Sequence, residues 1–154
     1  MAPARSRLRA AALTYPEVGS TARTLPAGYR HLRRTELVGS GPRVFAEAAA
    51  ALMSWQVHVR AGIGVSASSS IAAEGIDVLL LARIGPLRLS APCRVVYVID
   101  EPRRRDEPRR RGFAYGTLIP RNRPDVAADT ILAVADQVRA GTPGQAMYRH
   151  GPWV

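Results

Sequence analysis

Two strand-like segments joined by an arginine-rich connection place the strongest constraint on the fold of this chain. Residues 91–100 read APCRVVYVID and residues 112–118 read GFAYGTL, and both are rich in β-branched and aromatic side chains. Between them, residues 100–111 consist of the six-residue unit DEPRRR written twice. Such segments on either side of a polar connection predict an antiparallel pair of strands, around which the rest of the domain packs.

The duplicated unit has two interpretations. It is too short for a repeat fold, because six residues cannot bury a hydrophobic face. A lengthened, solvated loop is the simpler interpretation, since loop closure costs only about 0.6 kcal/mol more per doubling of length. The alternative is an arm that contacts phosphate or an acidic partner through its arginines. Its arginines are Arg103, Arg104, Arg105, Arg109, Arg110 and Arg111.

The central part of the chain predicts one helix among several strands. Pro42 suits the first turn of a helix, and apolar residues then recur at three- and four-residue spacing as far as Trp55. Apolar and polar residues alternate over 57–68, which predicts a strand with His58 on its polar face. Pro92 predicts an edge position or a bulge in its strand. Further strands are expected over residues 29–38, 76–83, 87–100 and 112–119.

The two ends of the chain are expected to differ from the middle. Residues 1–12 lack periodicity and predict a disordered arm. Residues 125–140 carry a thin apolar stripe at helical spacing, which predicts a helix ended by Gly141. Residues 141–154 predict an irregular tail. The expected organisation is one domain over residues 13–140, within the size of a single hydrophobic core.

Charge and cysteine usage narrow the classes of function. The chain has 154 residues and a net charge of +10. All its basic residues are arginines, and they are spread widely, which favours a dispersed positive surface over a dedicated nucleic-acid site. The lone Cys93 excludes an internal disulfide and fits a reducing cytoplasm. No apolar run is long enough to span a membrane, and the oligomeric state cannot be deduced.

Residues with chemical potential do not form a recognisable catalytic pattern. His31, His58 and His150 lie in different segments without metal-ligand spacing, so no metal is expected. Neither a phosphate-binding loop nor a nucleophile elbow is present, and we expect no cofactor. An enzyme remains the less favoured alternative. Its acid–base groups would come from Glu47, His58, Asp77 or Tyr115, although their spacing does not select them.

Several blocks of sequence, in order, resemble one protein family. They are YPEVGST (15–21), LPAGYRH (25–31), VGSGPRVFAEAAAALMSW (38–55), PCRVVYVIDEPRR (92–104) and GFAYGTL (112–118). Together they resemble the DUF1990 family of bacterial and plant proteins, whose domain has no established function. The resemblance implies no catalytic residue. The chain departs from the family in its lengthened arginine connection and in residues 119–154, which lack the expected acidic turn and further strands.

The order of expected elements predicts an α+β fold. The specific expectation is a curved antiparallel sheet gripping a helix, as in START and birch-pollen-allergen proteins. The departure after residue 118 leaves open whether this sheet is complete at its C-terminus. Such a fold can enclose a cavity for a small hydrophobic, lipid-like or aromatic ligand, and the alternative function is binding of nucleic acid or an acidic partner through loop 103–111. The expected lining residues are Phe45, Leu52, Val57, Val59, Ile63, Val65, Val95, Tyr97, Phe113 and Tyr115.

Overall fold

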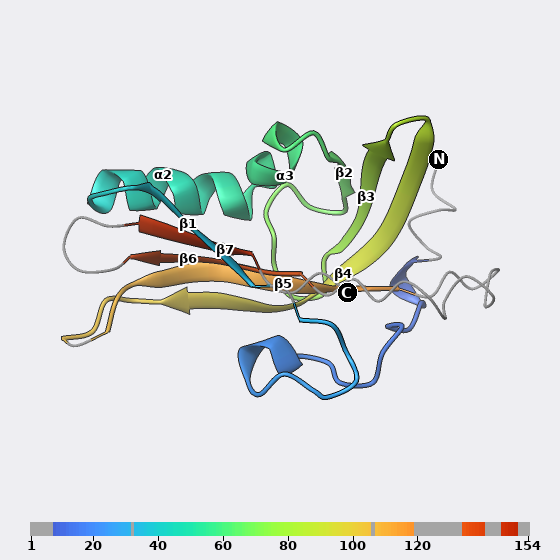
Figure 1. The fold of residues 1–154 in the computed structure, drawn as a ribbon, viewed down its shortest axis with the longest axis horizontal. Helices are drawn as coiled ribbons and strands as arrows, with labels where there is room; N and C mark the ends of the chain where they lie inside the picture. Colours follow the sequence, from blue (N-terminus) through green and yellow to red (C-terminus); the bar gives the residue numbers. More distant parts are fainter. Residues whose placement is uncertain (1–7, 32, 106, 119–133, 141–145, 151–154) are drawn as a thin grey trace.

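The protein is built on a single antiparallel sheet. The computed structural model describes residues 8–31, 33–105, 107–118, 134–140 and 146–150. These residues form a seven-stranded sheet in the order β1-β7-β6-β5-β4-β3-β2. Two helices lie on one face, and the N-terminal segment crosses the other (Figure 1). We call these the helix face and the arm face, and the arm is residues 8–31. The α+β fold class is therefore confirmed.

Most of the elements expected in the middle of the chain are present. The strands expected over 76–83, 87–100 and 112–119 are found, and so is the helix that starts at Pro42. The strand expected over 29–38 begins only at Arg34. The strands are β1 (Arg34–Gly39), β2 (Gly64–Ala67), β3 (Asp77–Ile84), β4 (Leu87–Glu101), β5 (Arg110–Thr117), β6 (Val134–Ala140) and β7 (Ala146–His150). The helices are α2 (Pro42–Met53) and α3 (Gln56–Arg60), with a short 3₁₀ turn, η1 (Ser20–Ala22).

The strand expected over 57–68 is largely wrong. Its first part is helix α3, and only Gly64–Ala67 forms a strand. Trp55 and His58 lie three residues apart, and the helical turn brings both into the core, where their exposed fractions are 3% and 5%. Alternation of small apolar residues suits a strand, but burial of these two large side chains decides the local structure. His58 is thus buried, not on a polar surface.

The C-terminal expectations also change. Residues 134–140 form strand β6 beside β5, where a helix over 125–140 was expected. Residues 146–150, within the expected irregular tail, form β7 between β6 and β1. The thin stripe at helical spacing gives way to pairing with neighbouring strands, which satisfies the backbone groups of the segment. The first part of the expected helix lies outside the described residues.

A bulge divides β4 into two halves. Val95 is opposite Tyr115 and Tyr97 is opposite Ala114, so Val96 has no partner of its own across the strand pair. In a regular strand over 87–100, Val95 and Tyr97 would share one face. The bulge breaks this alternation, and Tyr97 faces the arm. Pro92 is not at the bulge. Its carbonyl accepts a hydrogen bond from the Leu118 amide at the end of the β4–β5 pairing. A residue without an N–H is tolerated at such a position.

The core lies between the helix face and the two helices. Helix α2 contributes Phe45, Ala49, Leu52 and Met53. The sheet contributes alternate residues of three strands, including Val78, Leu80, Cys93, Val95, Phe113 and Tyr115. Because side chains alternate along a strand, the residues between them face the arm.

The arm is held on the opposite face by specific contacts. The Thr14 amide donates to the Thr117 carbonyl over 3.0 Å, and the two threonine hydroxyls are 2.6 Å apart. The Arg94 guanidinium bonds to Asp77 over 2.7 Å and donates to the carbonyls of Ala11 and Leu8. Residues 8–12, which were expected to be disordered, are thus anchored to the sheet.

Candidate functional site

A buried polar pair lies inside the aromatic part of the core. His58 Nε2 and Tyr115 Oη are 3.3 Å apart, and their side chains are 5% and 2% exposed. The Trp55 and Phe113 rings pack beside them, edge to face, with centroids 5.0 Å apart. A buried polar pair stabilises a unique arrangement only when its groups are satisfied. The pair therefore fixes how α3 sits on β5.

Trp55 controls the junction between the two helices. Its φ of 66° makes it the only non-glycine residue with positive φ among those described. The left-handed conformation costs a side-chain-bearing residue about 1–2 kcal/mol. The buried ring offsets this cost, and its Nε1 donates to the Ser69 carbonyl over 3.3 Å. Trp55 thereby ends α2, starts α3 and aims His58 at Tyr115.

The expected lining residues do not all meet. Phe45, Leu52, Val95, Phe113 and Tyr115 are packed together, with Val57, Ile63 and Val65 partly buried against them. Val59 is 49% exposed. Tyr97 lies on the arm face, where its hydroxyl bonds to Thr21 over 2.7 Å. Sequence reasoning did not place Trp55 among the lining residues, and it put His58 on a polar surface. The three-residue separation of Trp55 and His58 is nevertheless a helical signal.

The helix face continues past the packed core. Leu80 is opposite Ala91 and Ala82 is opposite Leu89, so these residues and Leu87 share the helix face. Leu80 is 6% exposed, whereas Leu89 and Leu87 are 51% and 62% exposed. We call Ala82, Leu87 and Leu89 the apolar stripe. It is an uncovered continuation of the core surface at the outer end of the β3–β4 hairpin.

Two arginines mark the tip of the same hairpin. Arg83 and Arg88 are directly opposite each other on the arm face, and both are exposed. Like charges in this position destabilise a strand pair. Within the described part of the chain, neither guanidinium has an acidic partner. An anion placed near them would relieve their repulsion.

The remaining candidate groups do not form a catalytic or metal-binding arrangement among the described residues. Burial raises the pKa of the Cys93 thiol to about 12, which makes it a poor nucleophile. Glu47 pairs with Arg43 on the exposed side of α2, far along the chain from the ion pair of Asp77 with Arg94. The described residues contain no group of three potential metal ligands. Within the same ranges, no helix is both long and apolar enough to cross a bilayer.

The duplicated unit forms the end of the β4–β5 hairpin. We call residues 100–105 the first copy and 106–111 the second copy. Asp100 is opposite Arg111 and Glu101 is opposite Arg110, and both pairs are ion pairs. Nearer the tip, the backbones of Arg104 and Glu107 exchange two hydrogen bonds of 3.3 Å. The hairpin therefore folds about the junction of the copies.

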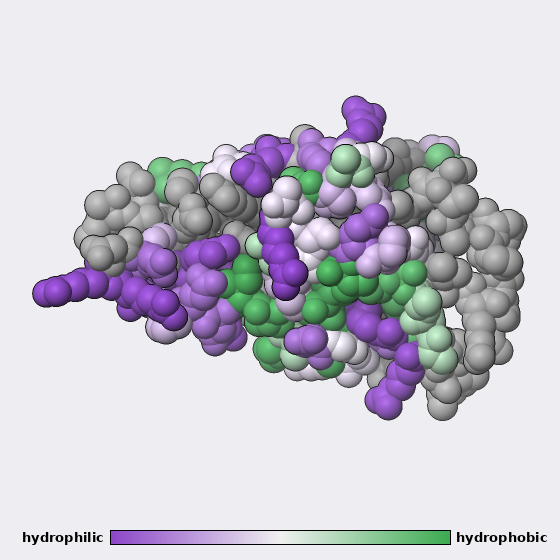
Figure 2. All heavy atoms as spheres, turned by 90° about the horizontal axis from the view of Figure 1, so that it is seen from below, coloured by the Kyte–Doolittle hydropathy of each residue, from purple (hydrophilic) through white to green (hydrophobic). Residues whose placement is uncertain are grey.

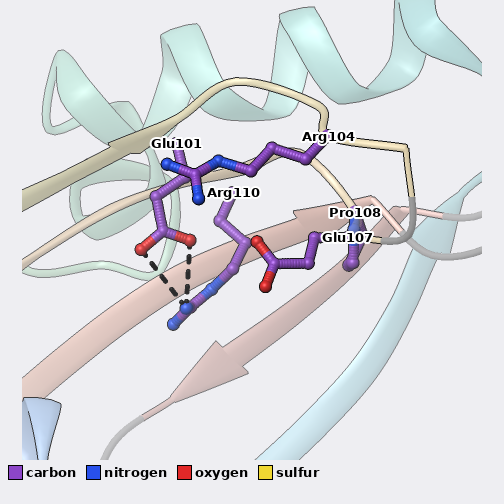
Figure 3. A pocket seen from close by; sticks show the side chains of 5 residues that line it. All are labelled: Glu101, Arg104, Glu107, Pro108 and Arg110. Atoms are coloured by element: carbon purple, nitrogen blue, oxygen red, sulfur yellow. Dashed lines mark hydrogen bonds and ion pairs between the residues drawn. The ribbon is translucent and has the colours of Figure 1, made fainter.

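The side of this hairpin that faces the arm has a small hollow. It measures about 320 Å³ and is lined by Glu101, Arg104, Glu107, Pro108 and Arg110. Figure 3 shows the carboxylates of Glu101 and Glu107 on either side of the Arg110 side chain. On the other side of the hairpin, the Arg109 guanidinium lies 5.0 Å from the centre of the Phe45 ring. The hollow carries both charges, and Pro108 is the only apolar residue among those that line it, so it does not suit a hydrophobic ligand.

Comparison with known proteins supports the resemblance seen in the sequence. The model of the family described as "Domain of unknown function (DUF1990)" matches residues 14–120, more than half of the 154 residues. The chain belongs to the DUF1990 family. No curated protein and no solved structure matches it.

The structure brings the DUF1990-like blocks of the sequence together. The YPEVGST block lies against the GFAYGTL block through Tyr15 and Gly116, next to the contact of Thr14 with Thr117. It lies against the PCRVVYVIDEPRR block through Thr21 and Tyr97. The family match ends at residue 120, which agrees with the expected departure after residue 118. Although the acidic turn is missing from the sequence, β6 and β7 continue the sheet.

Proposed function

We propose that the domain binds a small anionic amphiphile, such as a fatty acid, at the outer end of the β3–β4 hairpin. The apolar stripe carries the proposal, because it is a half-exposed apolar surface that continues the core of the domain. A hydrocarbon chain lying on it would remove apolar area from water, at about 25 cal/mol per Å². The ligand class is the hydrophobic, lipid-like one expected from the sequence.

The charge at the hairpin tip favours an anionic head group. Arg83 and Arg88 repel each other at the tip of the hairpin, on the face opposite to the stripe, and Arg88 directly follows Leu87. The head group would reach them by passing over the tip. A carboxylate can accept hydrogen bonds from two guanidinium groups at once. We therefore expect a fatty acid to bind more tightly than its neutral methyl ester. The packed His58–Tyr115 pair stays a structural feature of the core in this proposal. A cytoplasmic location remains part of it, supported by the buried, unpaired Cys93.

The test uses a fluorescent fatty acid titrated into the full chain. Leu89→Glu is expected to weaken binding at least about tenfold, because one buried leucine contributes about 1.5–3 kcal/mol. The matched control is Leu37→Glu, since Leu37 is 63% exposed in β1, at the far edge of the sheet from this hairpin. We expect the control to bind like the wild type. Absence of saturable binding by the wild type would overturn the proposal.

Two other occupants of the stripe give different results. If a second copy of the chain covers it, sedimentation shows a dimer that Leu89→Glu dissociates and no fatty acid binds. If the hairpin inserts into a bilayer, the protein binds anionic vesicles, and Leu81→Glu on the opposite face of the hairpin is as harmful as Leu89→Glu because both faces enter the lipid. Either result contradicts the proposal.

A further inference from the structure

The two copies of DEPRRR are identical in sequence but differ in how their arginines are used. All three arginines of the second copy make contacts within the molecule: Arg109 with Phe45, Arg110 with Glu101 and Arg111 with Asp100. The arginines of the first copy, Arg103–Arg105, are all exposed. Their side chains have no ion-pair partner among the residues that the structure describes.

Folding a repeat back on itself pairs the two copies in both directions. In a hairpin that turns at the junction of two copies, the first residue of one copy faces the last residue of the other. The acidic start of the first copy therefore pairs with the basic end of the second. At the base of the hairpin this pairing makes two ion pairs. Near the tip, Arg104 and Glu107 are joined by backbone hydrogen bonds, and the arginines of the first copy remain exposed.

The hairpin also projects from the body of the domain. The β4–β5 hairpin extends beyond the other strands at one end of the sheet (Figure 1), and the space-filling view shows a strongly hydrophilic projection there (Figure 2). A two-stranded ribbon is a shape that fits the major groove of a nucleic acid duplex. Arginine matches phosphate geometry through paired hydrogen bonds.

We propose that Arg103–Arg105 form a contact site for the phosphate backbone of a nucleic acid. A polyanion fits better than a single acidic peptide, because the whole chain has a net charge of +10 that attracts a long, uniformly charged partner. Arg104 also lines the hollow beneath the hairpin, but the hollow is not the phosphate site, since the carboxylates of Glu101 and Glu107 line it as well. Contact is made by the outer, exposed arginines.

The test measures binding of a labelled, mixed-sequence DNA duplex over a range of salt concentrations. Three phosphate contacts contribute about 0.9 each to the slope of log K against log salt. The triple variant R103A/R104A/R105A should therefore lower this slope by about 2–3. The matched control, R23A/R30A/R33A, removes the same charge from exposed arginines elsewhere and should change the slope less. Equal effects of the two variants would overturn the proposal.

A deletion tests whether the duplex is bound by the exposed arginines or by the shape of the hairpin alone. Removing the second copy, residues 106–111, leaves one unit whose Arg104 and Arg105 can pair with Glu101 and Asp100 across a Pro102–Arg103 turn. The hairpin should close, with its arginines now engaged, and duplex binding should weaken as in the triple variant. Unchanged duplex binding after the deletion contradicts the site. If the wild type binds polyglutamate but no duplex, and the triple variant loses the binding of polyglutamate, the partner is an acidic protein. That result would overturn the proposal.

Discussion

Gly116 and Tyr15 meet where the arm crosses the sheet. Tyr15 is 9% exposed, and its ring lies over the backbone of Gly116 near the C-terminal end of β5. A Cβ atom at position 116 would lie 2.7 Å from two carbons of this ring, closer than real Cβ contacts. A glycine in a strand interior often marks such close approach. The absence of a side chain is therefore what allows the arm to dock.

Gly116→Ala should destabilise the protein by about 1–3 kcal/mol, the usual range for overpacking a core. The reason is steric, so the same substitution should cost much less in a Tyr15→Ala background. Urea unfolding of the wild type, both single variants and the double variant measures this coupling. Additive effects would show that Gly116 does not act through Tyr15.

At the scale of single elements, the bulge in β4 explains how one strand serves two surfaces. Before it, Cys93 and Val95 face the helices, and after it Val98 does so, while Tyr97 turns to the arm. Strict alternation from the sequence assigns Tyr97 to the wrong face, because an extra residue in a strand leaves no compositional mark. The same limit applies to α3, where helical burial of Trp55 and His58 overrides an alternating pattern.

The hairpin base offers a test of the pairing between copies. The hydrogen bond from Arg111 lowers the pKa of the Asp100 carboxyl, which is consistent with their ion pair. Arg111→Asp places like charges opposite each other and should speed hydrogen exchange of the amides around Gly112. The exchanged pair, Asp100→Arg with Arg111→Asp, should restore slow exchange. If the exchanged pair is as labile as the single variant, the cross-strand pairing is not what closes the hairpin.

For the whole molecule, the sequence was sufficient for the α+β class, for helix α2 and for strands β3, β4 and β5. These segments combine clear periodicity with turn residues at their ends. It was insufficient after Leu118, because an alanine-rich stripe fits a helix as well as a strand, and only pairing with β5 decides between them. The apolar stripe could not be foreseen either, since exposure of Leu87 and Leu89 depends on where α2 and α3 end over the sheet.

Alkaline unfolding tests the arm as part of the whole fold. Burial, and to a smaller extent the nearby Cys93 thiol and the Tyr97 and Tyr29 hydroxyls, raises the pKa of Tyr15 from 10.0 to about 12. As pH rises, the Tyr15 hydroxyl therefore loses its proton in the unfolded chain before it does so in the folded protein. Its contribution to the free energy of unfolding is complete below pH 10 and is lost as pH rises towards 12. Tyr15→Phe should show a shallower decline in unfolding free energy over this range, measured by urea unfolding. An equally steep decline would place Tyr15 in water.

The contact between the arm and β5 also orders events in time. Thr14 and Thr117 are separated by 103 positions in the chain. A ribosome adds about 5–20 residues per second, so the arm waits on the order of 5–20 s before its partner strand is made. Arg94 can meet Asp77 and the carbonyls of Leu8 and Ala11 earlier, because all of them are made before it, but Thr117 follows later. Docking of the arm on β5 is thus a late step that closes the domain.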